Sequence, residues 1–253
     1  MESAGAIRPA RFIKRNRISG GAEEDVYMTR KEEIIAAYKD IGKDRSLYDG
    51  MMAGTSLVGR VLMKKIWNMT PDDALEYRAR ALEAIPADFN GALLEVPVGT
   101  GILSMPVWKT LPDAEITCMD ISENMMFMAR ERAEMTDVRN IHFVQGDAAA
   151  MPFGDESFDV VVSMNGFHAF SDKEAAFDEV FRVLKPGGLF CGCFYCEGRN
   201  AHTDKMVRRY YVRTGSFIPP FETPESLRRR LEARYAETDV SNVKSIVCFR
   251  CRK

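Results

Sequence analysis

The sequence predicts an α/β fold in which an open, doubly wound sheet occupies most of the chain. From about residue 90, short apolar runs alternate with segments that have helical periodicity. The apolar runs are almost uninterrupted, which is typical of parallel strands buried on both faces. The first run leads directly into a loop with two glycines, "GTG" at 99–101, and ligands of such sheets bind where the first strand turns into the first helix.

The strands and helices of this part follow in a regular order. The expected strands are 92–96, 115–120, 141–146, 158–164 and 188–195. Between them we expect helices over 122–135 and from Ser171, where Ser171 and Glu174 have the spacing of a capping box. The "KPGG" segment at 185–188 predicts a turn into the fifth strand, followed by helices near 200–213 and 223–235 and a closing hairpin over 236–251.

The N-terminal third predicts helices. The expected segments are 29–42 with Thr29 and Glu32 as a capping box, 56–68, and 70–86 with Thr70 as the N-cap. Residues 1–20 carry five basic side chains against one acidic residue. We therefore divide the chain into a basic, poorly ordered tail (1–25), a helical cap (26–87) and an α/β domain (88–253).

Composition narrows the class of protein. The chain has 253 residues, 46% of them hydrophobic and 28% charged, as in ordinary globular domains. No apolar run has the length of a membrane span, and the N-terminus lacks the apolar segment of a signal peptide. We therefore expect a cytoplasmic protein without a membrane span.

The residues after the first three strands predict a nucleotide-type site. Gly99 and Gly101 let the backbone approach a ligand closely. Asp120 ends the second strand, 19 residues beyond Gly101, where a carboxylate can accept both hydroxyls of a ribose. Asp147 follows the third strand, in a position to meet an adenine amino group. The glycine pattern alone would be a weak signal, and the acids strengthen it.

Four segments together resemble the class I S-adenosylmethionine-dependent methyltransferases. They are "LLEVPVGTG", "MDISENMMFMAR", "GDAAAMPFGDESFDVVVS" and "EVFRVLKPGG", within residues 92–195. The likeness is greatest to the branch of ubiquinone/menaquinone-biosynthesis C-methyltransferases, also called methyltransferase type 11. It implies a Rossmann-like sheet of seven strands, mostly parallel, with the last strand antiparallel and inserted beside the fifth.

The resemblance also implies a cofactor, S-adenosylmethionine, and a set of residues that bind it. The implied set is Glu95, Pro97, Gly99, Gly101, Asp120, Ile121, Met125, Asp147, Ala148 and Asn165. Pro97 and Val98 depart from the family's G-x-G-x-G pattern. Pro97 fits if the backbone there has negative φ and donates no hydrogen bond, whereas Val98 is expected to place its bulk on the cofactor side of the turn.

Two residues are candidates for a catalytic role. His168 follows the fourth strand, where it would contact substrate or act as a general base, with packing or a loop hydrogen bond as the alternative. Tyr48 matches a tyrosine–aspartate pair near the start of this branch and would form part of a lid, or else a surface position. His142 and His202 are expected to be structural and solvent-facing, respectively.

The six cysteines raise a separate question. Cys191, Cys193 and Cys196 would lie near Cys248 and Cys251 if the fifth and last strands are neighbours. Such a cluster could bind zinc, but free cysteine is a common small core residue, and we expect no metal.

We expect S-adenosylmethionine-dependent methyl transfer to a small, apolar or aromatic molecule, in a pocket whose walls come from the cap and from "FIPPF" at 217–221. The cap residues expected at the pocket are Ile34, Ile35, Leu57, Val58, Val61, Leu62 and Trp67. The alternatives are an RNA methyltransferase, suggested by the basic, aromatic-rich stretches 205–213 and 227–235, and a non-catalytic cofactor-binding protein. The sequence leaves the oligomeric state open.

Overall fold

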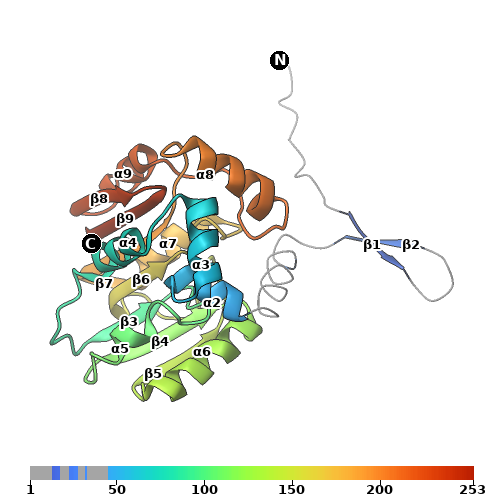
Figure 1. Cartoon of the computed structure of the whole chain (residues 1–253). Helices are drawn as coiled ribbons and strands as arrows, with labels where there is room; N and C mark the ends of the chain where they lie inside the picture. Colours follow the sequence, from blue (N-terminus) through green and yellow to red (C-terminus); the bar gives the residue numbers. More distant parts are fainter. Residues whose placement is uncertain (1–12, 18–22, 28–31, 33–44) are drawn as a thin grey trace.

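The computed structural model describes residues 13–17, 23–27, 32 and 45–253 (Figure 1). The helix predicted at 29–42 lies outside these residues except for Glu32, which is helical. Strands β1 (Ile13–Arg17) and β2 (Glu23–Tyr27) pair in antiparallel register, which the sequence had not predicted.

The centre of the molecule is a seven-stranded sheet in the order β5-β4-β3-β6-β7-β9-β8. Its strands are β3 (Ala92–Glu95), β4 (Glu115–Asp120), β5 (Ile141–Gln145), β6 (Phe158–Met164), β7 (Leu184–Tyr195), β8 (Glu237–Val243) and β9 (Ile246–Arg252). Strands β3 to β7 pair in parallel, and β9 pairs antiparallel with both β7 and β8. The predicted fold is thereby confirmed, including the antiparallel last strand beside the fifth strand of the domain.

Helices cover both faces of this sheet (Figure 1). They are α2 (Arg45–Ala53), α3 (Leu57–Leu62), α4 (Pro71–Leu82), α5 (Met105–Trp108), α6 (Glu123–Thr136), α7 (Lys173–Val183), α8 (Ala201–Met206) and α9 (Pro224–Glu232), with π-helical turns η2 (Met63–Trp67) and η3 (Val207–Val212). Side chains alternate across each strand, so Leu93 packs with α4, α5 and α6, and Leu94 packs with α7 and α9. The two resulting apolar layers fix the ends of the strands in place.

Helix starts follow local capping chemistry. Thr70 and Asp73 form the capping box of α4 reciprocally, as the sequence predicted for the N-cap. The capping box predicted for Ser171 and Glu174 is wrong. The N-cap of α7 is Asp172, whose carboxylate accepts from the Ala175 amide at 3.0 Å, so the helix starts one residue later.

The predicted turn at 185–188 is also wrong, because these residues belong to β7. Helix α7 passes directly into the strand at Leu184, and the two glycines are absorbed by a bulge in the β6–β7 register. Gly187 takes a φ of +73°, and its amide donates to the Lys253 carbonyl at 2.8 Å. A chain-terminal residue therefore holds the bulge.

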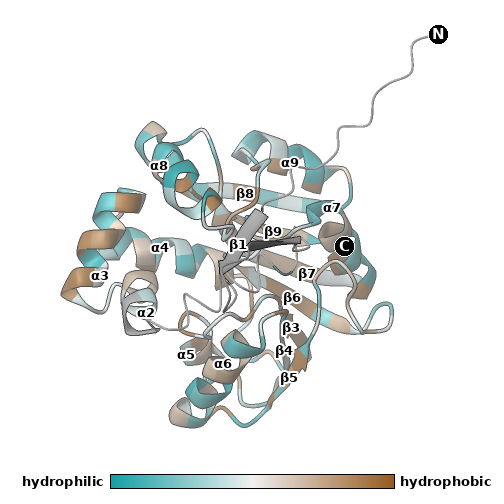
Figure 2. Cartoon of the chain, turned by 90° about the vertical axis from the view of Figure 1, so that its right-hand side faces the viewer, coloured by the Kyte–Doolittle hydropathy of each residue, from teal (hydrophilic) through white to brown (hydrophobic). Residues whose placement is uncertain are grey.

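The outer face of α3 corrects another expectation. Leu57, Val58 and Val61 are 72%, 59% and 57% exposed rather than buried in a pocket wall, and Figure 2 colours parts of α3 as hydrophobic. The reason is that α3 docks on α2 through Gly59, where a Cβ would lie 2.1 Å from the Gly50 carbonyl oxygen. In the part of the chain that the structure covers, no helix combines the length and apolarity needed to cross a bilayer.

Candidate active site

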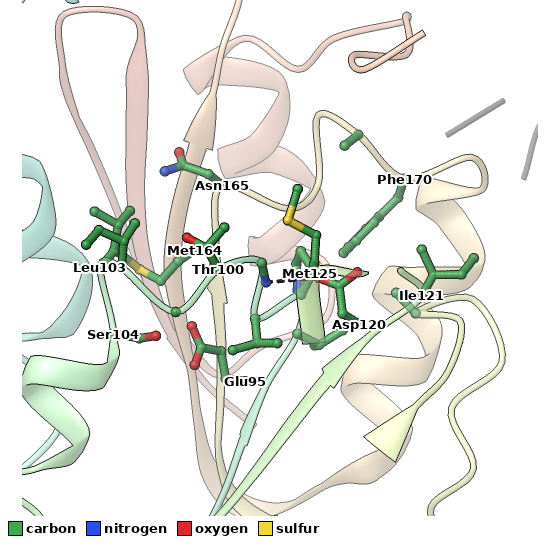
Figure 3. Close-up of a pocket in the computed structure, with 18 of the residues that line it drawn as sticks. Glu95, Thr100, Leu103, Ser104, Asp120, Ile121, Met125, Met164, Asn165 and Phe170 are labelled. Carbon is green, nitrogen blue, oxygen red and sulfur yellow. Dashed lines mark hydrogen bonds between the residues drawn. The ribbon is translucent and has the colours of Figure 1, made fainter. Parts of the chain in front are cut away.

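A cavity opens at the carboxyl ends of β3, β4 and β6 (Figure 3). It is lined by all ten predicted cofactor-binding residues, which are Glu95, Pro97, Gly99, Gly101, Asp120, Ile121, Met125, Asp147, Ala148 and Asn165. Tyr48 and Met52 reach the same cavity from α2. The geometry therefore brings together the residues that the sequence motifs singled out.

The glycine turn is built around two left-handed residues. Gly99 and Gly101 have φ values of +55° and +67°, which side-chain-bearing residues rarely adopt. A Cβ on Gly101 would lie 2.9 Å from Met105, so glycine is needed there for packing as well. A Cβ on Gly99 would meet no protein atom within 4 Å, which leaves open space over this peptide for a ligand.

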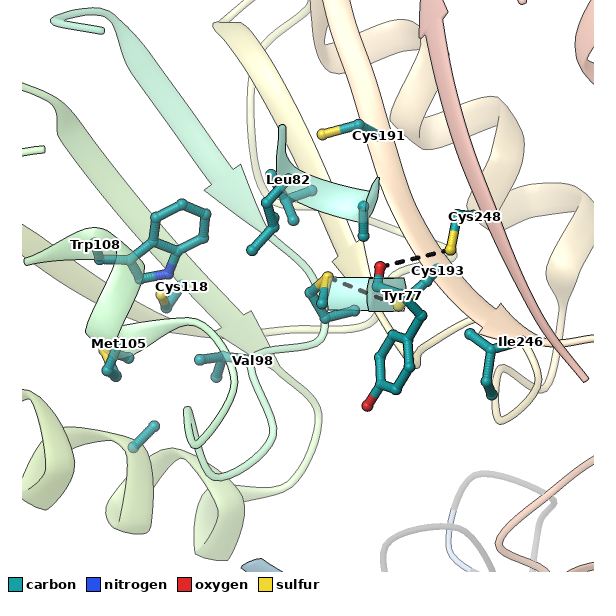
Figure 4. Packing of buried hydrophobic residues seen from close by; sticks show 14 of the residues in the cluster. Tyr77, Leu82, Val98, Met105, Trp108, Cys118, Cys191, Cys193, Ile246 and Cys248 are labelled. Atoms are coloured by element: carbon teal, nitrogen blue, oxygen red, sulfur yellow. Dashed lines mark hydrogen bonds between the residues drawn. The ribbon is translucent and has the colours of Figure 1, made fainter. Parts of the chain in front are cut away.

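Pro97 and Val98 are accommodated by the core beneath the turn. The Val96–Pro97 bond is cis, and Pro97 packs so closely on Gly166 that a Cβ there would lie 2.2 Å from the proline ring. Val98 contacts the cavity, but it is 5% exposed and packs in the apolar layer beside Met105 (Figure 4). Much of the valine bulk is therefore absorbed by the core, which was not expected from the sequence.

Two buried carboxylates stand at the floor of the cavity. Asp120 accepts from the Gly99 amide and from the Ser122 amide, each at 2.9 Å, and burial raises its pKa to about 6 in spite of these bonds. Glu95 accepts from the Trp108 indole at 2.7 Å, and burial raises its pKa to about 7. In the protein without ligand, both carboxylates therefore pay a desolvation penalty.

Helix α2 is tied to the glycine turn by polar contacts. Asp49 accepts from the Thr100 hydroxyl at 2.7 Å and pairs with Arg132 of α6. Arg132 also donates to the Thr100 carbonyl at 2.9 Å. Arg132 and Thr100 were not predicted from the sequence, because only the Tyr48–Asp49 pair matched a motif of the family that the sequence resembles. This network holds Tyr48 over the cavity.

A second cavity adjoins the first and shares lining residues with it. Its lining residues are Tyr48, Met51, Met52, Met63, Trp67, Met69, Tyr77, Asn165, His168, Tyr211, Ser216, Phe217 and Ile246. Tyr48, Met52 and Asn165 line both cavities. Phe217 belongs to the predicted "FIPPF" wall and Trp67 to the predicted cap wall, but most of this lining comes from distant segments that no sequence motif joined.

His168 and Asn165 lie on the loop after β6. His168 is 5% exposed, and its Nδ1 accepts from the Tyr195 backbone amide at 3.1 Å. Asn165 has a φ of +57°, a strained conformation for a residue with a side chain, and its backbone N–H donates to the Cys193 carbonyl. The other histidines lie elsewhere, since His142 is exposed on β5 and exposed His202 contacts the Lys65 carbonyl at 2.7 Å.

The cysteines are divided by the sheet. Cys191, Cys193 and Cys248 lie in the α4 layer (Figure 4), whereas Cys196 and Cys251 lie in the opposite layer. Within residues 45–253 and the short described segments before them, no group of three or more His, Cys, Asp or Glu side chains is placed to hold a metal ion.

The basic stretches 205–213 and 227–235 are engaged in part by the protein itself. Arg208 pairs with Glu197, Arg230 with Glu174 and Glu222, and Arg234 with Asp178. These arginines serve the attachment of α9 and η3 to the rest of the fold.

Comparison with known proteins identifies related sequences. Residues 93–188 match a family model described as a methyltransferase domain. Demethylmenaquinone methyltransferase from Thermus thermophilus is 36% identical over 114 residues, covering 45% of this chain and 51% of that protein. A ubiquinone/menaquinone biosynthesis C-methyltransferase from Dinoroseobacter shibae is 40% identical over 130 residues, covering 51% and 50%. The chain thus spans about half the length of the curated relatives it matches.

Solved structures share the fold at lower identity. An S-adenosylmethionine-dependent methyltransferase from Thermotoga maritima, described as a possible histamine N-methyltransferase, has a TM-score of 0.61 at 16% identity, covering 89% of this chain and all of that one. Phosphoethanolamine N-methyltransferase 2 from Haemonchus contortus, in complex with S-adenosylmethionine, has a TM-score of 0.62 at 17% identity, covering 87% and 48%. The [4+2]-cyclase SpnF has a TM-score of 0.63 at 17% identity, covering 87% and 96%.

Proposed function

We propose that the protein transfers a methyl group from S-adenosylmethionine to a small, apolar or aromatic molecule, because residues 93–188 match a methyltransferase-domain model and the curated relatives are methyltransferases. The observation that carries this proposal is the pair of adjoining cavities, one beside the glycine turn and one lined by methionines and aromatic rings. Tyr48, Met52 and Asn165 stand where the two meet, and there the methyl group would pass between ligands.

The first cavity suits an adenosyl sulfonium in chemical terms. The open side of Gly99 admits a ligand against the backbone, and Asp120 offers carboxylate lone pairs to ribose hydroxyls. Met125, which is 1% exposed, supplies an apolar wall, and Asp147 stands at the β5 end. When bound, S-adenosylmethionine supplies an electrophilic methyl group.

The remaining work of such a transfer is positioning. An acceptor in the second cavity would present its nucleophilic atom to that methyl group; the carbon–sulfur bond would break with its electron pair kept on sulfur, and the proton of an uncharged acceptor would pass to solvent. Tyr48 and Asn165 would align the acceptor at the junction, and Trp67, Tyr211 and Phe217 would exclude water from the second cavity. The names of the curated relatives favour an aromatic ring as the acceptor.

The proposal is tested by ligand binding to an Asp120→Asn variant. Loss of a charged hydrogen-bond acceptor should weaken S-adenosylhomocysteine binding by about tenfold to a hundredfold in calorimetry, equal to about 1.5–3 kcal/mol. Asp113→Asn changes an exposed aspartate in the same domain and is the matched control. Equal affinity of all three proteins would remove the cofactor assignment.

Activity is tested independently of binding. Purified protein supplied with S-adenosylmethionine and a panel of phenols, quinols and aromatic amines should release S-adenosylhomocysteine with one or more of them. Mass analysis of the product then identifies the methylated atom. Tight binding of the cofactor without turnover of any compound in the panel would favour a non-catalytic binding protein.

A further inference from the structure

The residues described around the second cavity carry no formal charge. Its described lining consists of four methionines, five aromatic residues, Ile246 and three polar residues, Asn165, His168 and Ser216. The Ser216 hydroxyl is already bonded to Thr214 at 3.0 Å. A ligand that carried a charge would leave that charge unpaired here, so the cavity suits an uncharged molecule.

The hydrogen bond to His168 fixes the tautomer of its ring. The Tyr195 backbone amide donates to Nδ1 at 3.1 Å, and an amide nitrogen in this role can only donate. Nδ1 therefore carries a lone pair, and the proton of the neutral imidazole is on Nε2. The ring is stacked on Phe217 with centroids 3.7 Å apart, which holds its orientation.

The surroundings of His168 keep this state over a wide pH range. Burial lowers the pKa of His168 to about 3, and the positive charge of Lys173 acts in the same direction. The tyrosines that line the cavity from α2, α4 and η3 are Tyr48, Tyr77 and Tyr211, and burial raises the pKa of each. None of these groups changes charge between about pH 5 and 9.

Nε2–H has no hydrogen-bond partner among the residues that the structure describes, although the side chain is only 5% exposed. An oxygen atom bound in the cavity that His168 lines would supply the missing acceptor. We propose that the second cavity binds an uncharged aromatic molecule through a carbonyl or hydroxyl oxygen that accepts a hydrogen bond from His168 Nε2. The statement that this molecule is the methyl acceptor rests on the proposed function. The statement that His168 binds its oxygen does not.

This arrangement gives His168 a role other than the general base considered from the sequence. Nδ1 is occupied by the Tyr195 amide, and Nε2 already carries its proton, so neither nitrogen can remove a proton from the acceptor. His168 is instead a positioning residue that selects molecules with an oxygen at one point of an otherwise apolar cavity.

The tautomer is tested on the unmodified protein by NMR with ¹⁵N-labelled histidine. One ring should show the Nε2–H signature with no change between pH 5 and 8, and addition of ligand should shift its Nε2 proton. His142 and His202 are exposed and provide solvent-facing references. A cationic ring or an Nδ1–H tautomer at the buried histidine would overturn the proposal.

Recognition of the oxygen is tested with 1-tetralone and tetralin, which differ only by a carbonyl oxygen. Both are titrated in the presence of S-adenosylhomocysteine, and the ratio of their dissociation constants is compared between proteins. The preference for tetralone should fall about threefold to tenfold in His168→Phe and return in His168→Gln, whose amide can donate. An unchanged ratio in His168→Phe would overturn the proposal.

The proposed function and the proposed role of His168 can be disproved separately. If S-adenosylhomocysteine does not bind the wild-type protein, the proposed function fails, and the tetralone titrations are then made without it. If it binds and the ratio is the same in all variants, only the role of His168 fails. The NMR result decides the matter if His168→Phe does not fold.

Discussion

At the scale of single residues, burial disfavours the charged forms of two carboxyl groups, because it removes water from them without providing a positive charge. Asp120 and Glu95 are 6% and 1% exposed, and desolvation dominates the pKa of each. Because neither carboxylate forms an ion pair within the described residues, their charge is held by neutral donors alone, such as the Trp108 indole. A ligand that brings a positive charge or hydrogen-bond donors would lower the free-energy cost of keeping these carboxylates charged.

Glu95 should therefore make stability depend on pH. Its pKa rises from about 4.5 unfolded to about 7 folded, so between these values the folded state binds more protons. The free energy of unfolding should fall as pH rises from about 4.5 to 7 and level off above. Glu95→Gln should remove up to about 3 kcal/mol of this decline.

Urea unfolding of wild type and Glu95→Gln at pH 5, 6, 7 and 8, without ligand, measures the effect. The difference between the two proteins isolates Glu95 from the other titrating groups. A difference that is constant over this range would show that Glu95 is already ionised at pH 5.

The sequence predicts site residues best where they belong to one short motif. Gly99, Gly101 and Asp120 lie within one strand–loop–helix motif and its neighbour, so spacing alone placed them at the cavity. The lining from Trp67 and Tyr211 comes from segments about 145 residues apart in the chain, and the fixed tautomer of His168 depends on a backbone amide of β7. Such contacts are made by tertiary packing and leave no local pattern.

At the scale of elements, the contact between α2 and α3 depends on two glycines. A Cβ on Gly59 would lie 2.1 Å from the Gly50 oxygen and 2.2 Å from its carbonyl carbon. Gly59→Ala gains about 1 kcal/mol of helix propensity but must push the helices apart, and overpacking costs about 1–3 kcal/mol. Because the clash is with backbone, we expect a net loss of about 1–2 kcal/mol.

Urea unfolding at constant pH measures this loss. Gly154→Ala is the control, because its Cβ would meet only the Ser157 hydroxyl, at 3.4 Å. If Gly59→Ala were as stable as the wild type, α2 and α3 would not be packed as the structure has them.

The polar network that ties α2 to α6 should show energetic coupling. Asp49 and Arg132 are paired with side chains 13% and 17% exposed, and both contact Thr100. Because each single substitution already removes the ion pair between these two side chains, the double variant Asp49→Ala/Arg132→Ala should lose about 1–3 kcal/mol less than the sum of the single variants.

The exposed pair Asp137–Arg139 provides the control cycle. Its side chains are 65% and 86% exposed, and its coupling should be below about 1 kcal/mol. Equal coupling in the two cycles would mean that the α2 network is a surface contact without special strength.

The presence of most strands and helices was predicted correctly, whereas the residues at which they begin and end were predicted less well. The cap of α4 was correct because Thr70 and Asp73 form a complete capping box within four residues. The start of α7 was misplaced because Ser171 and Asp172 are both good N-caps, and the sequence alone does not rank them. The bulge at 185–188 depends on pairing with Lys253, which is distant in the chain.

At the scale of the whole molecule, β7 and β9 hold the two halves of the sheet together. They also carry four of the six cysteines, and a fifth, Cys196, follows directly after β7. The sixth, Cys118, lies on β4, and all six thiols are buried. Burial raises the pKa of Cys191 and Cys251, like those of Cys196 and Cys248, to about 12. Because the thiolate is the reactive species, native thiols should react very slowly.

A thiol reagent added to the native protein should therefore modify fewer than one cysteine per chain rapidly, and six in urea. The slow native reaction should need opening of the β7–β9 pair, which crosses both apolar layers and so amounts to global unfolding. A ligand that binds only the folded state then slows the reaction by mass action. At a hundred times its dissociation constant, S-adenosylhomocysteine should slow the reaction about a hundredfold. A reaction rate independent of the ligand would indicate instead that the β8–β9 edge opens locally while the cofactor cavity stays folded.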